Sequence, residues 1–308
     1  MRILVTGGAG FIGSNVVDAL LKKGHKVVVL DNLSSGKKEN INKESKFYKV
    51  DVFDRKNVSA IFKKEKPDVV IHNAAQIDVS ASVVDPFFDA KINILGAINV
   101  LDSCVKTKVN KVIFASSGGT IYGECDVSAP NEESKANPLS PYGIAKNSVE
   151  NYIKFYSAVY SLDYTILRYG NVYGPRQDPY GETGVIAIFV TKMLHGKDVN
   201  IFGDGKQMRD YVYVSDVVNA NLKALNKGKN QIINIGTSKA VSVNKLLEVM
   251  SNAIGYSKKT VYKPKREGEL FKSFLNIDKA KKVLGWTPET CIEKGIKKTI
   301  EYFKMGNK

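Results

Sequence analysis

A glycine-rich turn near the N-terminus constrains the fold of this chain more than any other feature. The stretch Gly-Gly-Ala-Gly-Phe-Ile-Gly at 7–13 follows the apolar run 3–5 and opens a helical pattern that ends at Gly24. Glycines in this arrangement allow a tight turn and let backbone N–H groups approach a pyrophosphate at the start of a helix. The stretch has the G-x-G-x-x-G spacing in the strand–turn–helix context that this fingerprint requires. We therefore expect a dinucleotide-binding βαβ unit here.

An acid at the end of the second apolar run indicates which dinucleotide binds. Asp31 follows the glycine turn by about 20 residues, where a carboxylate accepts hydrogen bonds from both hydroxyls of the adenosine ribose. A 2′-phosphate at the same place would meet the negative charge of Asp31. Lys37 and Lys38 stand nearby in the sequence and weaken this argument. We predict NAD rather than NADP as the cofactor.

Apolar runs and helical patterns alternate through the first part of the chain. This alternation predicts βαβ units and an α/β fold with a Rossmann-type doubly wound parallel sheet. The pattern is less regular after Pro175, which indicates a smaller C-terminal substrate-binding lobe. We expect an NAD-binding domain at 1–174, with segments near 204–240 returning to it, and a second lobe at 175–308, which the family resemblance given below implies mainly binds a nucleotide sugar. The expected strands are 3–5, 26–31, 47–51, 69–73, 111–117, 163–168 and 232–235, and the expected helices include 57–66, 89–106, 141–160, 185–195, 242–254, 279–284 and 292–304.

Composition excludes several classes of protein. The 308 residues are 43% hydrophobic and 25% charged, as in an ordinary soluble globular protein. No apolar run spans a bilayer and the first strand leaves no room for a signal peptide, so we expect a cytoplasmic protein without a membrane partner. The net charge of +15 is spread over lysine pairs rather than gathered in one arm, so nucleic-acid binding is not favoured. The three cysteines and three histidines are scattered, and no metal site is expected.

A tyrosine and a lysine four residues apart carry the clearest catalytic signal. Ser140 and Pro141 are typical of an N-cap and a first helical residue, so Tyr142 and Lys146 share one face of the helix that follows. A phenol titrates at about 10 in model peptides, too high for a base at neutral pH, but a neighbouring ammonium favours the phenolate. The pair is therefore a candidate general base and its activator. The same spacing also occurs on amphipathic helices with a buried ring and a solvated lysine.

Short segments along nearly the whole chain carry a resemblance to a known family. They are the turn at 7–13, LDNLSSG at 30–36, DV at 51–52, HNAA at 72–75, NILG at 93–96, SSGGTIYG at 116–123, YGIAK at 142–146, LRYGNVYGP at 167–175, FGDG at 202–205, MRDYV at 208–212 and REGE at 266–269. In this order they resemble the extended short-chain dehydrogenase/reductase family and, within it, the UDP-glucose (UDP-galactose) 4-epimerases and related nucleotide-sugar epimerases. The set is less specific for the sugar than for the family.

The resemblance implies positions for both ligands. Around NAD it places Gly7, Gly10, Phe11, Ile12 and Gly13 at the pyrophosphate, Asp31, Asn32, Ser35 and Gly36 at the adenosine ribose, Asp51 and Val52 at the adenine, Ala74, Ala75 and Asn93 in the cleft, and Ser116, Tyr142, Lys146 and Tyr169 at the nicotinamide half. Around the UDP-hexose it places Asn171, Arg209 and Arg266 at the diphosphate, Val185, Ile186, Asn200 and Phe202 at the uridine, and Glu269 and Ser273 in the segment beside the sugar.

Chemistry supports part of this assignment independently. Planar, permanently charged guanidinium groups such as those of Arg209 and Arg266 suit diphosphate oxygens, although each arginine alone is also consistent with a surface ion pair. Core packing accounts for Val185, Ile186 and Phe202 equally well.

The resemblance also implies a reaction. The phenolate of Tyr142 takes the proton of the sugar 4-hydroxyl while a hydride passes from C4 to NAD. The 4-keto sugar then turns over in the site, and the hydride returns to its other face. The charge of Lys146, added to that of the oxidised ring, is expected to lower the pKa of Tyr142. NAD would be regenerated in each cycle and stay bound.

Two positions bear on how this chain differs from its relatives. Counted back from Ile121, the hydroxyl-bearing residue that most relatives place near the sugar is Gly118, so Ser117, Thr120 or a water would replace it, with Ser117 preferred. Ser273 stands where a tyrosine would exclude N-acetyl sugars. We therefore predict that UDP-N-acetylglucosamine is accepted alongside UDP-glucose.

Other interpretations remain open at this level. The chain is also consistent with UDP-glucuronate epimerisation, with dTDP- or GDP-sugar chemistry, or with a non-catalytic NAD- or RNA-binding member of the fold. The resemblance further implies a homodimer formed through the helical patterns at 89–106 and 141–160.

Overall fold

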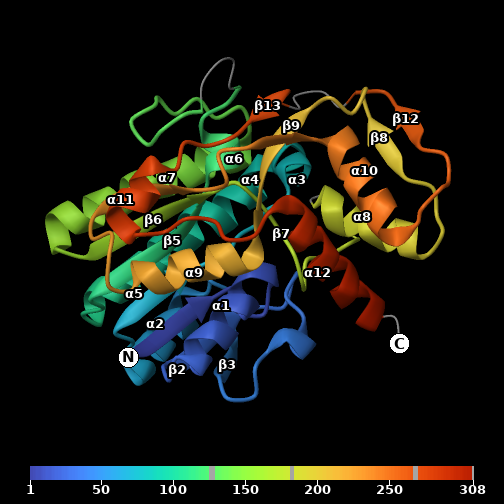
Figure 1. Ribbon diagram of the computed structural model, residues 1–308. Coiled ribbons are helices and arrows are strands. Elements are labelled where there is room, and N and C mark those ends of the chain that lie inside the picture. Colours follow the sequence, from blue (N-terminus) through green and yellow to red (C-terminus); the bar gives the residue numbers. More distant parts are fainter. Residues whose placement is uncertain (125–128, 181–183, 266–269, 307–308) are drawn as a thin grey trace.

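Seven parallel strands form the main sheet of the computed structural model, which describes residues 1–124, 129–180, 184–265 and 270–306. The strand order is β10-β6-β5-β4-β1-β2-β3, so the chain runs from β1 to one edge and starts again at β4 toward the other. Helices cover the sheet on both faces (Figure 1). The predicted Rossmann-type α/β fold is confirmed. The strands are β1 (Arg2–Thr6), β2 (Lys26–Asp31), β3 (Lys46–Lys49), β4 (Val69–His72), β5 (Lys111–Ser117), β6 (Asp163–Tyr169) and β10 (Gln231–Ile235).

The register of the central strands brings their carboxyl ends to one edge of the sheet. Thr6 at the end of β1 lies opposite Leu30 in β2 and His72 in β4. Ligands of open parallel sheets bind beyond the carboxyl ends, where the strand order reverses. This reversal falls between β1 and β4, so the loops that follow these two strands border the expected binding crevice.

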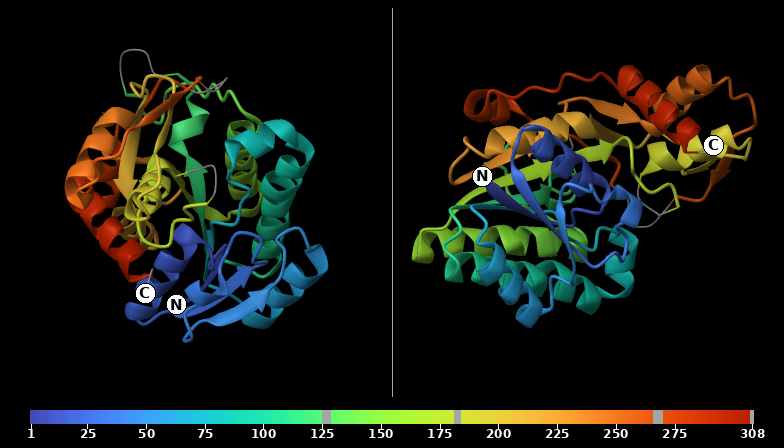
Figure 2. Two further views of the ribbon diagram at one scale, coloured as in Figure 1. Left: turned by 90° about the vertical axis from the view of Figure 1, so that its right-hand side faces the viewer. Right: turned by 90° about the horizontal axis from the view of Figure 1, so that it is seen from below.

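Two helical layers enclose the sheet, and the alternation of side chains along each strand divides the core between them. Ile3 and Val5 of β1 belong to the core formed with α1 and α9, whereas Leu4 belongs to the core formed with α2, α5 and α7. Figure 2 shows the sheet between these layers. The helices are α1 (Phe11–Lys22), α9 (Val214–Ala224), α2 (Arg55–Glu65), α5 (Gly96–Lys106) and α7 (Pro141–Tyr160).

Local sequence signals fix the start of α7, the helix that carries Tyr142. The Ser140 hydroxyl accepts a hydrogen bond from the Gly143 N–H at 3.2 Å, and Pro141 is the first helical residue. A proline suits this position because the first helical N–H groups have no partner within the helix. The predicted helix at 141–160 is confirmed, and Tyr142 lies in its first turn.

A smaller group of strands and helices lies beside the main sheet (Figure 1). Its centre is β9, which pairs with β7, β11 and β13, while β8 pairs with β12. The chain then returns to the main sheet at β10, which pairs with β6. The division of the chain at residue 174 stays a prediction. The elements of this part are β7 (Asn171–Tyr173), α8 (Val185–Leu194), β8 (Asn200–Phe202), β9 (Met208–Tyr213), β11 (Ala240–Ser242), α10 (Val243–Ile254), β12 (Val261–Lys263), β13 (Lys272–Ser273) and α12 (Ile292–Met305). α11 (Asp278–Leu284) instead packs against β10 of the main sheet and α9.

The helices differ from the sequence-based expectation in two places. The pattern at 89–106 lies within one continuous helical stretch that starts three residues earlier than expected and contains a π-bulge: α4 (Pro86–Ala90), a π-helical turn η2 (Lys91–Leu95) and α5. α9 was not expected, because it follows β9 directly without a side-chain N-cap, glycine or proline to mark its start. The other short helices are η1 (Lys38–Asn40), α3 (Val79–Val84) and α6 (Gly118–Ile121). Among the described helices, none is long and apolar enough to cross a membrane.

Candidate functional site

The glycine turn after β1 is shaped by contacts that admit no larger side chains. Gly7 has a φ of 67°, and a Cβ there would lie 2.7 Å from the backbone nitrogen of Ala74, in the loop after β4. A Cβ on Gly13 would lie 2.1 Å from the carbonyl oxygen of Gly7. At Gly10 it would meet only that same carbonyl oxygen, at 3.3 Å, and Gly10 lines a cavity. The turn is therefore closed toward the protein and open toward the cavity, as a phosphate cradle requires.

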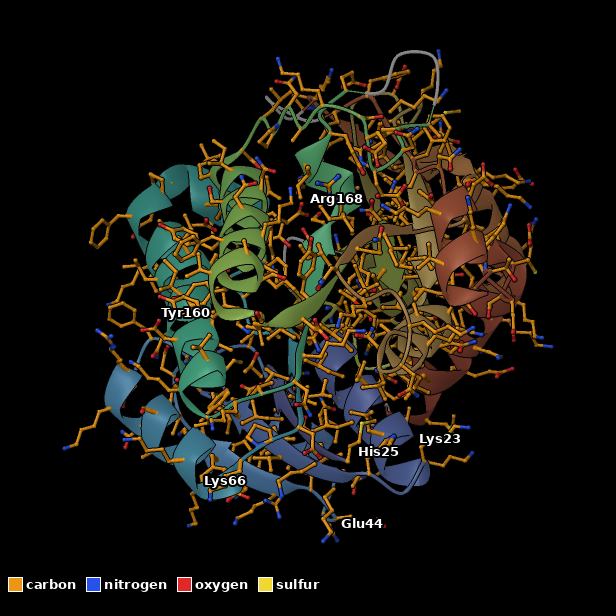
Figure 3. All side chains as sticks on the ribbon, turned by 90° about the vertical axis from the view of Figure 1, so that its left-hand side faces the viewer. Lys23, His25, Glu44, Lys66, Tyr160 and Arg168 are labelled. Carbon is orange, nitrogen blue, oxygen red and sulfur yellow. The ribbon has the colours of Figure 1, made fainter. Side chains whose placement is uncertain are left out.

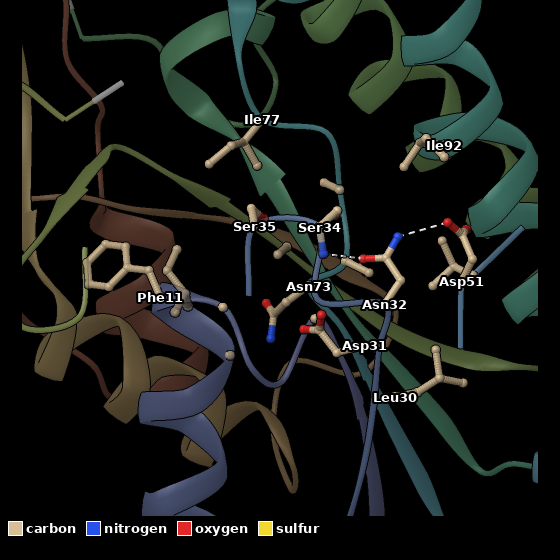
Figure 4. A pocket seen from close by; sticks show the side chains of 18 of the residues that line it. Phe11, Leu30, Asp31, Asn32, Ser34, Ser35, Asp51, Asn73, Ile77 and Ile92 are labelled. Carbon is tan, nitrogen blue, oxygen red and sulfur yellow. Dashed lines mark hydrogen bonds between the residues drawn. The ribbon is translucent and has the colours of Figure 1, made fainter. Parts of the chain in front are cut away.

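The acid at the end of β2 is held by the same turn. Asp31 is buried, and its two carboxylate oxygens accept hydrogen bonds from the Ala9 N–H at 3.0 Å and the Leu33 N–H at 2.8 Å. Asn32 donates to Asp51 at 2.8 Å, which joins the ends of β2 and β3 (Figure 4). The fixed carboxylate and the Asn32–Asp51 pair face the end of the cavity where an adenosine ribose is expected.

Most of the residues predicted for the cofactor line this first cavity. They are Gly7, Gly10, Phe11, Ile12, Gly13, Asp31, Asn32, Ser35, Asp51, Val52, Ala74, Ala75, Ser116, Tyr142, Lys146 and Tyr169. Gly36 and Asn93 do not line it. Gly36 packs against Asp31 and Ala9, and Asn93 hydrogen-bonds the backbone of Gln76.

Asn73 lines the same cavity and was assigned no role from the sequence. Both polar atoms of its side chain are buried without a hydrogen-bond partner among the described residues. It stands among the side chains around the pocket (Figure 4). Buried amides are nearly always paired, so these atoms fit a polar ligand such as a dinucleotide. Its place directly after β4, at the strand-order reversal, is the signal that could have identified it.

Lys146 lies at the inner end of the cavity, beneath Tyr142. Its ammonium donates a hydrogen bond to the Ala115 carbonyl at 2.9 Å and lies 5.6 Å from the centre of the Tyr142 ring. Burial lowers the pKa of Lys146 to about 8, an effect opposed by the carboxylates of Asp89 and Glu150. Near neutral pH the lysine is therefore charged and close to the phenol.

The phenol itself is not activated in the free protein. Burial raises the pKa of Tyr142, and the negative charge of Asp89 adds to this effect, while a hydrogen bond with Ser117 opposes it. Desolvation of the phenolate dominates in the free protein. The expectation that the charges of Lys146 and the oxidised ring together lower this pKa concerns the protein with its cofactor and stays a prediction. Without ligands, Tyr142 is a protonated phenol.

Gly118 does not face the site. A Cβ at Gly118 would lie 2.7 Å from the methyl groups of Leu275, in the core, and Gly118 does not line a cavity. The residue that presents a hydroxyl to Tyr142 is Ser117, at the end of β5. Gly118 supplies no hydroxyl, and at the start of α6 it is turned toward the core. The replacement of the missing hydroxyl by Ser117 stays a prediction.

A second cavity adjoins the first and holds several of the predicted substrate residues. Asn171, Val185, Ile186 and Arg209 line it, together with Ser117, Gly119 and Thr120. Asn200 and Phe202 lie on β8 and do not line it. Ser273 is buried behind its wall and donates to the Gly119 carbonyl at 3.5 Å. Arg266 and Glu269 lie outside the described residues.

Arg209 is the cation on the wall of this second cavity among the described residues. It lies on β9, and its guanidinium donates to the Met208 carbonyl at 2.8 Å. Fixing one side of the guanidinium in this way orients the group that suits a diphosphate.

The two cavities share a common wall. Six residues line both, namely Phe11, Ile12, Ile77, Ser116, Tyr142 and Tyr169. A dinucleotide in the first cavity and a sugar nucleotide in the second would therefore meet at Tyr142. This arrangement suits hydride and proton transfer at one carbon of the second ligand.

Known proteins are similar to this chain in sequence and in overall structure. Residues 3–236 match the family described as NAD dependent epimerase/dehydratase. The chain is 43% identical over 310 residues to a UDP-glucose 4-epimerase of Mycolicibacterium smegmatis, with 99% of each covered. A crystal structure of a UDP-glucose 4-epimerase from Thermotoga maritima with UDP-glucose gives a TM-score of 0.99 at 52% identity, covering 100% of both chains. A UDP-glucose 4-epimerase of Thermus thermophilus, solved with NAD, gives 0.95 at 42% identity and 99% of each chain.

The chain belongs to the NAD-dependent epimerase/dehydratase family. The resemblance seen in the sequence is confirmed, as is NAD as the cofactor.

In this epimerase/dehydratase, a buried ion pair supports the shared wall from behind. Arg168 of β6 contacts Glu150 of α7 at 2.6 Å, and Glu150 also accepts a hydrogen bond from Ser116 at 2.6 Å. Arg168 lies in the interior, whereas Lys23 and Glu44 point outward (Figure 3). The pair is completely satisfied, because Arg168 also donates to the Tyr122 hydroxyl at 2.7 Å. Sequence analysis missed this network because each of its residues alone is typical of a helix or strand surface.

Proposed function

We propose that this protein is an NAD-dependent 4-epimerase that interconverts UDP-glucose and UDP-galactose. The observation that carries the proposal is the position of Tyr142, which lines the cofactor cavity and the substrate cavity at once. The solved relatives that bear the name UDP-glucose 4-epimerase, at 52% and 42% identity over nearly the whole chain, support this substrate class.

The residues at the shared wall have separate tasks in this reaction. NAD held by the first cavity would supply the hydride chemistry at C4 of the sugar, as acceptor and then as donor. Tyr142 accepts the proton of the 4-hydroxyl and gives it back, while the hydrogen bond with Ser117 favours the phenolate. Lys146 supplies a positive charge beneath the ring. Burial raises the pKa of Tyr142 in the free protein, so positive charge beside the ring, such as that of Lys146, would favour proton removal.

The substrate cavity also supplies groups that would anchor the nucleotide while the sugar turns over. Arg209 and Asn171 line this cavity, and Val185 and Ile186 of α8 supply an apolar surface suited to a uracil ring. Arg266 is expected to add a second guanidinium. A diphosphate held at a fixed point lets the oxidised sugar present either face to the same nicotinamide.

We infer that N-acetyl sugars are also accepted. Ser273 is fully enclosed and touches the backbone of Gly119, which forms part of the cavity wall. A tyrosine in place of Ser273 has no space there without pushing this wall into the cavity. The small side chain therefore favours a wider sugar pocket.

We also propose a homodimer formed through α7 and the neighbouring short helices. Phe155 and Val159 of α7 and Val84 and Phe87 of α3 and α4 are large apolar residues with at least half of their surface exposed. A second copy of the chain would cover this face. The cytoplasmic location, a role in galactose metabolism and the division of the chain at residue 174 likewise stay predictions.

The proposed function is tested with purified protein and no added NAD. UDP-glucose, UDP-N-acetylglucosamine and UDP-glucuronate are incubated separately, and the anomeric proton signals are followed by NMR. We expect the first two to reach equilibrium with their C4 epimers and UDP-glucuronate to remain unchanged. Ser273→Tyr is expected to abolish turnover of the N-acetyl sugar while sparing UDP-glucose. Conversion of UDP-glucuronate alone would contradict the proposal.

A further inference from the structure

Asp89 is a buried carboxylate next to the catalytic pair. It lies in α4, only 1% exposed, and α4 packs against α7, the helix of Tyr142 and Lys146. A buried aspartate is costly unless its charge is matched or fully hydrogen-bonded. The burial of Asp89 therefore requires compensation by hydrogen bonds and nearby charges.

One carboxylate oxygen of Asp89 fastens the loop that follows β4. This oxygen accepts hydrogen bonds from the Asn93 amide at 2.9 Å and the Gln76 amide at 3.1 Å. Asn93 in turn binds the backbone N–H and carbonyl of Gln76, each at 3.0 Å. The neighbours of Gln76, Ala75 and Ile77, line the cofactor cavity, and Ile77 also lines the substrate cavity. The Asp89–Asn93–Gln76 cluster thus fixes the course of the cavity wall.

The other carboxylate oxygen is buried and has no hydrogen-bond partner in the described part of the chain. Hydrogen bonding alone therefore does not account for the negative charge of Asp89. Burial raises the pKa of Asp89, while the hydrogen bond from Asn93 and the charge of Lys146 oppose this. The Asp89 charge in turn favours the Lys146 ammonium and disfavours the Tyr142 phenolate.

The other charged groups around this cluster have partners of their own. Glu150 of α7 also acts on Lys146, but its carboxylate contacts the Arg168 guanidinium through two hydrogen bonds, at 2.6 and 2.9 Å. His72 of β4 is buried against Lys146 and stays neutral, with its pKa lowered to about 3. Lys91 of η2 lies over the Phe53 ring at 4.7 Å. α3 contributes no charged side chain.

We propose that Asp89 is a positioning residue of the epimerase reaction: its carboxylate is the counter-charge of the Lys146 ammonium and the anchor of the Gln76 loop. It does not touch the reacting atoms and acts through Lys146, Tyr142 and the cavity wall. This assignment builds on the proposed function, in which Tyr142 and Lys146 are the base and its activator.

In Asp89→Asn, the pKa values of both Lys146 and Tyr142 are expected to fall. The amide keeps an oxygen for Asn93 and Gln76 but loses the charge, so ammonium and phenol both release their protons more readily. Activity needs Tyr142 deprotonated and Lys146 protonated, so both limbs of the pH profile move to lower pH, by about 0.5 to 1 unit. If Asp89 were purely structural, the substitution would lower activity at every pH without shifting the pH profile along the pH axis.

Lysine titration tests the charge effect without turnover. The protein is labelled with ¹³Cε-lysine, and the Lys146 signal is identified by its absence in Lys146→Met. We expect its midpoint about 0.5 to 1 pH unit lower in Asp89→Asn than in the parent. Lys111 is an internal control, because its pKa is also lowered to about 8 by burial and its ammonium binds the Ala224 carbonyl at 2.6 Å, at the opposite end of β5. Its midpoint should not change.

Further variants separate charge from shape. Asp89→Ser is a second neutral variant and should show the same shift if the asparagine disturbs the fold. Asp89→Glu keeps the charge, so its pH profile should keep its position even if its height falls. Glu301→Gln, an exposed charge change on α12, is the matched control. A Lys146 midpoint in both neutral variants equal to or above that of the parent overturns the proposal, whether or not the enzyme turns over UDP-glucose.

Discussion

The Ser117 hydroxyl and the Tyr142 phenol interact where the end of β5 meets the first turn of α7. This contact favours the phenolate of a tyrosine whose burial otherwise raises its pKa. Both residues line the substrate cavity. Ser117 is thus the side chain best placed to help Tyr142 move a proton.

Ser117→Ala is therefore expected to reduce kcat by about 10- to 100-fold, because a hydrogen bond that would stabilise the phenolate of Tyr142 is lost. KM for UDP-glucose should change little. Thr120→Ala is the comparison, since Thr120 lines the same cavity and its hydroxyl has no hydrogen-bond partner among the described residues; it should lower kcat less than Ser117→Ala does. Steady-state kinetics of both variants measure kcat and KM for UDP-glucose. Equal kcat in Ser117→Ala and the parent would leave Tyr142 acting without this help.

Two adjacent glycines are expected to respond in opposite ways to the same change. Gly118→Ala places a methyl group 2.7 Å from Leu275, so we expect a loss of about 1–3 kcal/mol in the free energy of unfolding. A methyl group on Gly119 would lie 3.4 Å from the Asn171 amide oxygen, in the substrate cavity. Gly119→Ala should therefore keep stability and raise KM. Urea unfolding and kinetics of the two variants measure this, and equal stability of both would contradict the placement of Gly118.

The buried His72 is expected to make the folded protein less stable as the pH falls. It is buried, its Nδ1 lies 2.7 Å from the Thr6 hydroxyl, and desolvation together with the Lys146 charge lowers its pKa to about 3. The unfolded chain binds this proton more tightly, at about 6.5, so stability falls as the pH decreases through 6.5 toward 3. The loss from His72 between pH 7.5 and pH 5 is about 2 kcal/mol.

This contribution is measured by urea unfolding at the two pH values. His72→Gln is expected to lose about 2 kcal/mol less than the parent over the same interval, whatever its absolute stability. An identical loss in the parent and the variant would show that His72 is not the group that titrates.

The sequence carried enough information for the sheet and for most of the cofactor site. The glycine turn and Asp31 are local signals, because strand, turn and helix follow one another within one βαβ unit. The N-cap at Ser140 likewise placed Tyr142 in its helix turn. Such features depend on residues close together in the chain, so spacing alone predicts them.

Other parts of the site depend on contacts between distant segments. The direction of Gly118 depends on Leu275, and the pKa of Tyr142 depends on burial and on Asp89. Asn73 gains its importance from the reversal of strand order between β1 and β4. No spacing rule reveals these relationships, because they arise only when the β5 loop, α4 and β13 come together.

The most direct test of the account is Tyr142→Phe, because Tyr142 alone is assigned the transfer of the 4-hydroxyl proton. UDP-glucose turnover without added NAD is followed by NMR, and bound NAD is measured after release from the denatured protein. Tyr152→Phe, an exposed tyrosine on the same helix, is the control. The account predicts that Tyr142→Phe keeps its NAD and loses at least about 100-fold in turnover, while Tyr152→Phe matches the parent. Turnover of Tyr142→Phe at the parent rate would contradict it.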